Sequence, residues 1–582
     1  MERDVMRMIT KNALAHHTRA YYSGTDKVII FCGAACVLPE LSVEGSSGGV
    51  GDEVTDSTDP HYGSFAVPVN VNGTVCTAYI NAPLYRSGNT ADVLDWTAGK
   101  VIRKISGGSV LPTPSEENVI CPVIEQSEGI TVLDVLTSVT PSALKVSALV
   151  YTYASPSEYA DIAGLEADFE HNTFTRLAGA AGRSPGTDFS VFAPYGDRTR
   201  CNVADDGRIT ARFGDAAYRD DGSNGQVMVY QPKFYYCVIP MKTEVNPAGG
   251  FHIRKAHYYI SAVPRPGFKL HPAFYGEHGK PVDYIMYSAY EGVLYDTSAE
   301  RYVNDGTDTG TAFDADADLI CSVASQKPIS GRYKSLTRMN FEKLASNRGA
   351  GWHGDMFKAE SANQMLFAVE YASFNSQNVL GPGVVDLPSL SGNNAVLTGS
   401  TASLGNGSGS APSSVAELNG TQTIGTAPEK VAVSYRGMEN PWGNVWKHLS
   451  GINVYGSGEA SGGRAYIADD YSFSDSKYTE NYKSVGFALP QSSSTGYISA
   501  FGFASEAYDW AFIPSELGGS ANGPVGDMCL TKSDLSGGRT AAYGGYWGRG
   551  ENCGAFLLLM SSAVAYKSFS IGGRLVYVPS DN

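Results

Sequence analysis

The chain has 582 residues, of which 42% are apolar and 18% are charged, and its formal net charge is −16. This length suffices for several domains with sizeable cores. The negative charge and the lack of a Lys/Arg-rich stripe exclude a nucleic-acid partner from our predictions, because phosphate binding requires clustered positive charge. The 66 glycines, 35 tyrosines and 23 phenylalanines favour a fold rich in strands and loops over a helical bundle.

The N-terminal region carries no typical targeting signal. Its longest apolar run, Val28–Leu38, has the length of a signal-peptide core but follows a polar segment that contains His16 and His17. No apolar run approaches the roughly 20 residues of a membrane-spanning helix. We therefore expect a protein made in the cytoplasm without a signal peptide and without membrane insertion.

Residues 1–60 are predicted to form an N-terminal attachment segment that ends in an acidic, Gly/Ser-rich linker, Glu44–Asp59. Within the linker, Gly45–Gly49 matches the G-x-S-x-G pattern of a nucleophile elbow. That motif requires a buried strand before it and a helix after it. The linker offers neither, so we interpret the match as chance.

Residues 61–156 are predicted to form a β-rich module. The segments "SFAVPVNVNGTVCTAYI", "KVIRKI" and "KVSALVYTY" show the apolar alternation of short antiparallel strands. Asn72-Gly73, between two apolar runs, predicts a tight hairpin turn.

Residues 157–582 are predicted to form one α+β domain that binds a ligand. Aromatic-rich strands alternate with turns, and apolar residues at three- and four-residue spacings predict helices over Ser335–Gly349 and Lys358–Asn375. A Ser/Gly/Asn/Thr-rich stretch near 389–425 is predicted to be a mobile, exposed insertion.

Several residues of this domain are predicted to have structural roles. Gly349 and Gly351 allow close backbone approach after the first helix, and Trp352 should fill the core beside them. Trp442 and Trp446, four residues apart, should point inward from one short helical turn. Arg574 should form an ion pair or bond to backbone carbonyls.

No motif predicts a metal or cofactor site. The nine cysteines lack paired C-x-x-C spacings, which argues against a disulfide framework and a zinc site and favours buried, free thiols, even for the closest pair, Cys32 and Cys36. For four histidines in aromatic surroundings we favour structural hydrogen bonds over metal binding; they are His257, His271, His278 and His353. Asp305–Asp318 alternates carboxylates that could bind calcium, but it lacks the fixed glycine and closing Glu of an EF-hand, so a solvated acidic loop is favoured.

A series of motifs in the second half resembles a known group of proteins. In chain order it includes "PYGDRTRCNVADDGRITARFGD", "PRPGFKLHPAF", "RGAGWH", "MLFAVEYASFNSQNVLG", "YRGMENPWGNVWKHLSGINV", "SGGRTAAYGGYW", "GAFLLL" and "IGGRL". Together these motifs resemble the C-type-lectin-fold domain of phage tail-fibre and receptor-binding proteins, including the variable proteins of diversity-generating retroelements. They are similar, more distantly, to the formylglycine-generating-enzyme variant of that fold. Earlier in the chain, "INAPLYRSGNTADVLDWTAGKVIRKI" resembles a segment of tail-associated structural proteins of phages.

The resemblance implies a mixed sheet with two helices, whose last strands present a binding face. Aligning the fixed motifs around 543–570 implies that Trp547, Phe556, Leu558 and Ile571 are buried, with Leu557 and Leu559 facing outward. Tyr543 also belongs to the implied ligand-binding stretch. The other implied ligand-binding positions are Tyr546, Gly548, Arg549, Glu551, Asn552, Ser561, Ala565, Tyr566 and Ser568.

The resemblance implies a virion adhesin of the phage tail that adsorbs to a host-surface protein or glycan, binds other tail proteins and forms a homotrimer. The catalytic cysteines of the enzyme variant have no matching pair here, so no catalytic residue, metal or cofactor is assigned and we expect no enzymatic activity. Two alternatives remain open: a virion glycan hydrolase or depolymerase with a pair of carboxylates in a cleft, and a purely structural tail or decoration protein.

Overall fold

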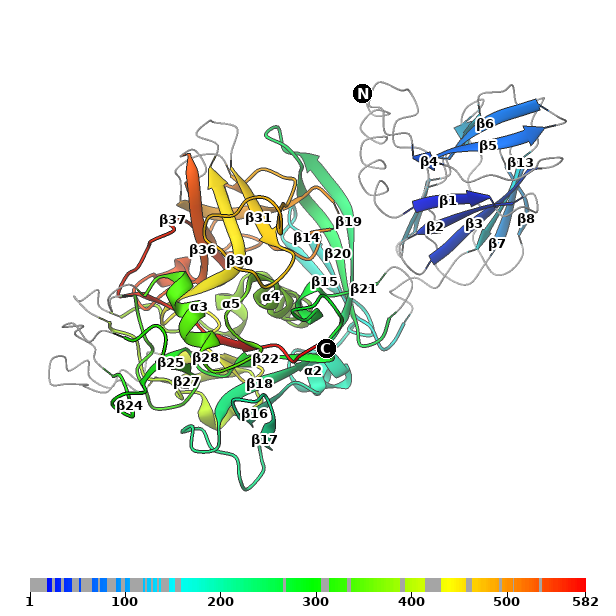
Figure 1. The fold of residues 1–582 in the computed structure, drawn as a ribbon. Coiled ribbons are helices and arrows are strands. Elements are labelled where there is room, and N and C mark those ends of the chain that lie inside the picture. The colour runs from blue at the N-terminus through cyan, green and yellow to red at the C-terminus, as the bar shows by residue number, and fades with distance from the viewer. Residues whose placement is uncertain are drawn as a thin grey trace. The chain divides into compact units, whose positions relative to one another are not determined.

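The structure is a computed structural model. From residue 159 onward it describes residues 159–264, 268–304, 313–331, 336–387, 393–413, 431–456, 463–490, 495–505, 507–532 and 536–581, and before residue 159 the backbone of strands β1 to β13. The chain divides into two compact units (Figure 1). The first comprises 1–164 with two short segments, Leu177–Ala181 and Val263–Lys269, and the second comprises the rest of the chain. The described residues are mostly strand with few helices, which is compatible with the predicted α+β class.

The first unit contains two larger sheets and a separate hairpin. One sheet has the order β1-β2-β3-β13-β7-β8, the other has the order β4-β5-β6-β12-β9, and β10 pairs with β11. Their bounds are β1 (Thr18–Tyr22), β2 (Lys27–Cys32), β3 (Cys36–Val43), β4 (Asp52–Glu53), β5 (Phe65–Val71), β6 (Thr74–Ile80), β7 (Ala91–Asp95), β8 (Lys100–Lys104), β9 (Val119–Ile120), β10 (Val123–Gln126), β11 (Gly129–Val132), β12 (Val135–Thr137) and β13 (Val146–Tyr151).

Strand pairing in this unit confirms the hairpin at Asn72-Gly73, since Val71 pairs with Thr74 across it. It also joins two segments that the sequence suggested were separate. Strand β3 pairs with β13, and β4, which lies inside the predicted linker, pairs with β5. Strands from residues 1–60 and from 61–156 therefore share sheets.

The second unit is built around a large sheet whose main path is β15-β14-β20-β33-β35-β37-β36-β30-β31-β32. Beside this path, β19 pairs with β20 and β21, β34 with β33, and β38 with β30. The bounds are β14 (Ala163–Asp168), β15 (Thr173–Ala178), β19 (Tyr235–Val245), β20 (Phe251–Ser261), β21 (Lys269–Leu270), β30 (Trp446–Gly456), β31 (Arg464–Ala468), β32 (Tyr482–Ser484), β33 (Thr495–Phe503), β34 (Pro514–Leu517), β35 (Met528–Thr531), β36 (Gly537–Gly544), β37 (Gly554–Ala563) and β38 (Ile571–Gly572).

A smaller sheet has the order β17-β16-β18-β22-β39-β26, so the last strand of the chain lies between strands from far earlier in the sequence. Two three-stranded sheets, β24-β23-β25 and β27-β28-β29, complete the strands. The bounds are β16 (Thr199–Val203), β17 (Ile209–Arg212), β18 (Gln226–Pro232), β22 (Tyr284–Ser288), β23 (Val293–Asp296), β24 (Arg301–Tyr302), β25 (Leu319–Cys321), β26 (Trp352–Gly354), β27 (Gly409–Pro412), β28 (Val431–Tyr435), β29 (Met438–Glu439) and β39 (Leu575–Tyr577).

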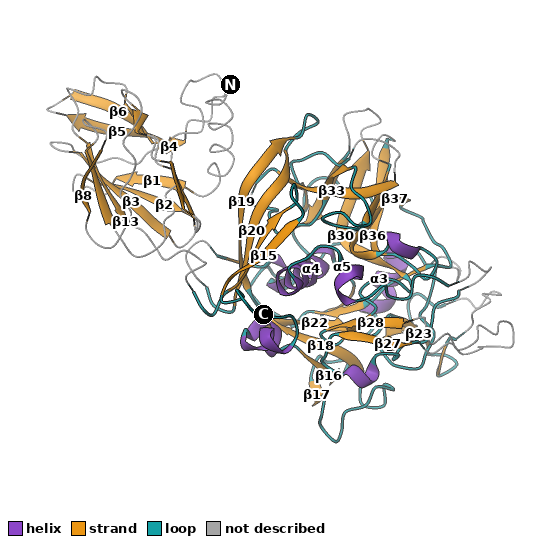
Figure 2. Ribbon diagram, turned by 180° about the vertical axis from the view of Figure 1, so that it is seen from behind, coloured by secondary structure: helices purple, strands orange, loops and turns teal. Residues whose placement is uncertain are grey.

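Helices α3 (Arg338–Ser346), α4 (Phe357–Tyr371) and α5 (Ser376–Leu380) lie in a layer between the large sheet and the smaller sheets, as both views show (Figures 1 and 2). Both predicted helices are confirmed and are shorter than predicted, and α4 begins one residue before its predicted start. Helix α4 is buried on nearly every side, as its middle position requires, and it ends where Ala372 adopts a left-handed conformation with φ of 48°. The remaining short helices in the described part of the chain are η4 (Thr187–Val191), α2 (Ala193–Gly196), η5 (Pro272–Phe274), η6 (Ala402–Leu404) and η7 (Gly550–Asn552).

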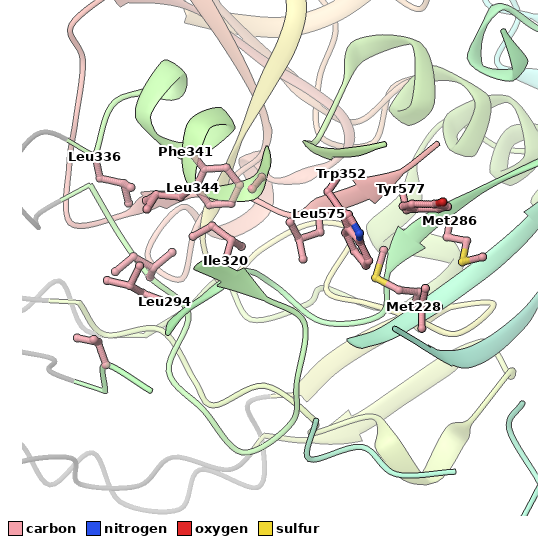
Figure 3. Packing of buried hydrophobic residues seen from close by; sticks show 14 of the residues in the cluster. Met228, Met286, Leu294, Ile320, Leu336, Phe341, Leu344, Trp352, Leu575 and Tyr577 are labelled. Carbon is pink, nitrogen blue, oxygen red and sulfur yellow. The ribbon is translucent and has the colours of Figure 1, made fainter. Parts of the chain in front are cut away.

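An apolar cluster packs α3 against the smaller sheet (Figure 3). Trp352 is fully buried there, its ring centroid lies 5.1 Å from that of Tyr577, and its indole N–H donates to the Asp205 carbonyl at 2.8 Å. The predicted role of Trp352 in the core is confirmed. Gly351 has φ of +80°, and a Cβ atom at this position would lie 2.3 Å from the Val578 carbonyl oxygen.

Arg338, the first residue of α3, fixes an irregular section of β30. The pairing of β30 with β36 shifts between Leu449 and Asn453, so residues 450–452 of β30 have no register partner in β36. The Arg338 guanidinium donates to the Leu449 carbonyl at 2.9 Å and to the Ile452 carbonyl at 2.6 Å, and it forms an ion pair with Asp475. One buried side chain thus attaches α3 to the large sheet.

Two expectations about this unit are wrong in part. Trp442 and Trp446 are both buried, but Trp446 begins strand β30 instead of lying on a helical turn with Trp442.

Residues 393–413, within the predicted mobile insertion, form η6 and β27 with buried side chains such as Val396. Their polar backbone is bound by a carboxylate, because Glu439 accepts hydrogen bonds from the backbone N–H groups of Gly399 and Thr401 at 2.8 and 2.6 Å. The rest of that predicted insertion lies outside the described residues.

We predict that Gly351→Ala destabilises the second unit more than Gly279→Ala does. Both glycines have a positive φ, +80° and +75°, but only at Gly351 would the new Cβ atom meet another group within 4 Å. Gly279→Ala should cost about 1–2 kcal/mol from backbone strain alone, and Gly351→Ala should cost about 1–3 kcal/mol more because Val578 must move. Urea unfolding followed by tryptophan fluorescence measures both; equal losses would contradict the proposed close approach.

Candidate functional site

The predicted ligand-binding stretch lies at the middle of the large sheet. Strand β37 has β35 on one side, in parallel, and β36 on the other, antiparallel. Gly545, just after β36, has φ of +85°, and a Cβ atom there would lie 2.2 Å from the Cys553 sulfur. A glycine is therefore required for the chain to turn back and place Tyr546 beside β37.

One side of this part of the sheet, which we call the outer side, carries a thin apolar layer. Leu557 and Leu559 of β37 pack there with Trp446, Ala542 and Ile571. Four partly exposed side chains cover this layer; they are Met528, Leu530, Tyr546 and Tyr566. We call this surface, together with 548–552 and 561–568, the C-terminal face.

Most of the predicted binding residues reach the surface of the C-terminal face. Three are exposed; they are Gly548, Glu551 and Ala565. Six are partly exposed; they are Tyr546, Arg549, Asn552, Ser561, Tyr566 and Ser568. Tyr546 and Tyr566 pack on the same apolar layer, so the structure brings the two segments that carry these residues to one side of the sheet. Their ligand contact stays a prediction.

Three of the predicted binding residues do not face solvent. Leu557 and Tyr543 have no exposed surface and Leu559 has 6%, so the predicted outward exposure of both leucines is wrong. The predicted alternation is correct in direction, since Leu557 and Leu559 share the outer side of β37. The outer side is itself covered, however, by Tyr546 and Tyr566 from the flanking loops.

The fixed positions in this stretch are buried, as expected. Trp547, Phe556, Leu558 and Ile571 are at most 1% exposed. The Phe556 ring lies 4.9 Å from that of Phe374, among other aromatic rings on the inner side of the sheet. The inner side of β37 therefore packs on the core while its outer side supports the C-terminal face.

Neighbouring strands add residues that the sequence did not single out. Met528 and Leu530 come from β35, and Tyr497 comes from β33, where it pairs with Met528. The Tyr497 hydroxyl donates to the Asn552 side-chain oxygen at 3.0 Å. An alternating exposure pattern in "MCLT" marks β35 as a strand with one outer side, but only the sheet order shows that it lies beside β37.

A buried polar layer lies under the inner side of the sheet. The Tyr543 hydroxyl donates to Asp355 at 2.6 Å, and Asp355 also accepts from the Met356 backbone N–H at 2.9 Å. Burial raises the pKa of Asp355 to about 6. Burial and the nearby Asp355 charge raise the pKa of Glu360, which lies beside the same Tyr543 hydroxyl.

Cations in the same layer hold the C-terminal strands to the rest of the unit. Arg574 donates to the Ser288 carbonyl at 3.2 Å and to the Asn440 carbonyl at 2.8 Å, and it also bonds the Glu439 carbonyl, which confirms its predicted backbone hydrogen bonds. Lys447 forms an ion pair with Glu291 at 3.1 Å, both without exposed surface, and burial lowers the pKa of Lys447 to about 8.

This layer does not form an active site open to solvent. Asp355 and Glu360 are each 1% exposed, so this pair of carboxyl groups lines no accessible surface. Among the described residues, no group of three or more His, Cys, Asp or Glu side chains could hold a metal ion. In the described part of Asp305–Asp318, Asp318 caps its own loop: it accepts from the Thr297 and Asp314 backbone N–H groups at 3.0 and 2.8 Å.

The described cysteines have structural surroundings, as predicted, and so do three of the four histidines assigned structural hydrogen bonds, while His278 is exposed. Cys201, Cys237, Cys321, Cys529 and Cys553 are free and buried, while Cys32, Cys36, Cys76 and Cys121 have no described side chains.

Among the histidines, His257 bonds Glu166 at 2.9 Å, and the His271 ring accepts from the Ala273 N–H at 3.2 Å. His353 lies between Glu342 and Glu277, at 3.0 and 3.1 Å.

No protein-family model matches this chain, and no curated protein matches it significantly. Within the part of the chain that the structure describes, no helix has the length and apolar character needed to cross a bilayer.

We predict that Tyr543→Phe destabilises the protein by about 1–3 kcal/mol, because it removes a hydrogen bond to the buried Asp355 carboxylate. The matched control is Tyr546→Phe, since the Tyr546 hydroxyl has no hydrogen bond among the described residues; its cost should be under about 0.5 kcal/mol. Chemical unfolding at pH 8 measures both values. Equal stability of the two variants would show that the Tyr543 hydroxyl does not support the inner side of the sheet.

We also predict a pH-dependent contribution of His353. Burial lowers the pKa of this ring, but hydrogen bonds to Glu277 and Glu342 outweigh burial and raise the pKa to about 9. A group whose pKa is raised by folding stabilises the folded protein. This stabilisation is complete below the pKa of the unfolded state, about 6.5, and is lost as the pH rises through 9. The difference in unfolding free energy between wild type and His353→Gln should fall by up to about 3 kcal/mol from pH 6 to pH 10. A constant difference would contradict a charged His353.

Proposed function

We propose that this protein is a receptor-binding adhesin of a phage tail, and that its second unit has a C-type-lectin fold whose C-terminal face binds a ligand on the host surface. The ordered sequence motifs support this proposal. So does the arrangement of the second unit, in which helices lie between a large mixed sheet and smaller antiparallel sheets and β36 and β37 occupy the centre of the large sheet (Figure 1). The first unit, with its separate sheets, would then attach the adhesin to other tail proteins of the virion. We keep the homotrimer as part of this proposal.

The observation that carries the proposal is the composition and support of the C-terminal face. Tyr497, Tyr546 and Tyr566 are partly exposed there, next to Arg549 and Asn552. Tyrosine and arginine supply large contact areas and hydrogen bonds, and tyrosine loses little conformational entropy on binding. The face rests on fully buried side chains of β37, so its contacts are preorganised.

The same face is suited to sequence diversification by a retroelement. Substitutions at Glu551 or Ala565 would change exposed surface and leave the core unchanged, whereas a Cβ atom on Gly548 would lie 3.2 Å from the Tyr546 ring. Substitution of Leu557 or Leu559 would alter a packed layer, with costs of about 2–5 kcal/mol for truncation to alanine. Under this proposal, variation that preserves the fold concentrates in the two loops that flank β37.

We predict that the double variant Glu551→Arg/Tyr566→Ser binds host cells at least ten-fold more weakly than the wild-type chain. The purified, fluorescently labelled full chain would be titrated on a panel of bacterial strains, and strains that bind it would be used for the comparison. Glu551 is exposed, whereas Tyr566 packs on the apolar layer, so thermal unfolding of the variant is measured as well and binding is compared at a temperature at which both proteins are folded.

The matched control is Asp206→Arg/Tyr275→Ser, which makes the same types of change at surface positions outside the C-terminal face. The control should bind like the wild type. A purely structural protein would bind no strain, and a binding surface elsewhere would leave the Glu551/Tyr566 variant unaffected; either result contradicts the proposal. Release of soluble sugar from the cells by the wild type would instead support the glycan hydrolase.

A further inference from the structure

A second group of aromatic side chains lies at the other end of the same sheet. Tyr455 of β30 is 42% exposed, and its ring centroid lies 4.9 Å from that of Tyr478. Tyr466 of β31 lies 5.5 Å from Tyr478, and both ring pairs have an edge-to-face arrangement. We call these three residues the tyrosine cluster. No sequence motif pointed to it.

The register of the strands places the tyrosine cluster on the outer side of the sheet. Tyr466 pairs with Asn453, Asn453 pairs with Thr540, and Thr540 pairs with Ser562 of β37. Directly paired residues point to the same side of a sheet, so Tyr466 and Ser562 share one side. Tyr455 is two residues from Asn453 and therefore points to that side as well.

The same side continues into the C-terminal face. Ala542, two residues from Thr540 along β36, pairs with Leu559, and both belong to the apolar layer of that face. Figure 1 shows β31, β30, β36 and β37 side by side in this order. The tyrosine cluster and the C-terminal face thus lie on the same side of β36. Between them lie the buried residues Asn453 and Thr540, and the Asn453 side-chain oxygen accepts a hydrogen bond from Arg338 at 2.6 Å.

The tyrosine cluster is held in place by close packing on the backbone. A Cβ atom on Gly538, which pairs with Tyr455, would lie 1.9 Å from the Tyr478 hydroxyl oxygen. Tyr478 therefore lies directly over β36, between the other two rings. An exposed aromatic group that is fixed in this way loses little entropy when it binds a partner.

We propose that the tyrosine cluster is a second contact area for the ligand of the C-terminal face, and that this ligand is the surface of a folded protein. The inference rests on the proposed function, and it adds residues and a ligand class to it.

The size of the combined surface favours a macromolecule. Five strand-to-strand steps separate β31 from β33 along the sheet. At about 4.8 Å per step they span about 24 Å. A surface of this width can hold a standard protein interface, which buries about 800 Å² per partner. A single sugar or small metabolite would cover less than this width.

The chemistry of the surface favours a protein over a polysaccharide. Its centre is apolar, with the partly exposed side chains Met528 and Leu530 over a buried layer, and its margin is polar, with Asn552 and Ser561. An apolar centre with a polar rim, enriched in Tyr, Met and Arg, is the usual composition of a protein interface. The hydroxyl groups of a glycan chain would leave Met528 and Leu530 without apolar partners.

A cationic ligand fits the tyrosine cluster poorly. Three aromatic rings can surround a quaternary ammonium group. However, the guanidinium groups of Arg338 and Arg539 lie close enough to Tyr478 to act electrostatically on its phenol group. Asp475 neutralises Arg338 through their ion pair, and Arg539 leaves one positive charge beside the rings.

The test uses the purified full chain and the bacterial strains that bind it. We expect Tyr455→Ser and Tyr455→Ser/Tyr466→Ser to bind at least ten-fold more weakly than wild type, with unchanged thermal unfolding of the single variant. The matched control is Tyr275→Ser, which removes a tyrosine of similar exposure, 37%, outside this surface. Cells treated with protease should lose binding, and cells treated with periodate, which oxidises glycans, should keep it.

Each other result overturns a defined part of the inference. If both Tyr455 variants bind with wild-type affinity while the Glu551/Tyr566 variant loses binding, the tyrosine cluster is not a ligand contact and the C-terminal face still is. Loss of binding after periodate and not after protease would identify a glycan ligand. A changed oligomeric state of Tyr455→Ser in sedimentation would assign the cluster to contacts between copies of this chain. Lack of wild-type binding to every strain would overturn the proposed function itself.

Discussion

The architecture of the second unit depends on the buried polar layer between the large sheet and the smaller sheets. Arg574, close to the end of the chain, binds backbone carbonyls of Ser288 and Asn440, and so joins segments that are far apart in sequence. The Lys447–Glu291 ion pair and the Tyr543–Asp355 hydrogen bond belong to the same layer. Buried charges of this kind cost much free energy if they lose a partner. The layer therefore favours one specific arrangement of the C-terminal strands.

This constraint explains why one side of the sheet is available for binding. The inner side of β36 and β37 is fixed by Tyr543, Phe556 and Leu558, which have no exposed surface. The outer side carries only a thin apolar layer, and partly exposed residues such as Met528 and Tyr566 cover it. A rigid inner side and a thinly covered outer side are what a preorganised recognition surface requires. The proposed ligand surface, including the tyrosine cluster, lies entirely on the outer side.

Local sequence patterns predicted the parts of this fold that depend on local chemistry. Periodic apolar residues located α3 and α4, and Asn72-Gly73 located a hairpin. The exposure of Leu557 and Leu559 could not be predicted in the same way, because a strand pattern shows which side a residue is on and not what covers that side. Their cover comes partly from β35, which becomes a neighbour of β37 only through the sheet order.

Other misassignments have the same origin in distant contacts. The four-residue spacing of Trp442 and Trp446 fits a helix, but pairing of Trp446 with Ile571 of β38 overrides it. The polar composition of 393–413 indicated an exposed loop, yet the distant Glu439 carboxylate binds its backbone.

The central claim is that the outer side of the sheet is the surface that meets the host. Tyrosine iodination, read by mass spectrometry with the full chain free and bound to cells, tests it most directly because one experiment compares all exposed tyrosines. The account predicts that binding protects Tyr455, Tyr546 and Tyr566 from iodination while Tyr275 stays reactive. Protection of Tyr275 with no change at the other three tyrosines would contradict it.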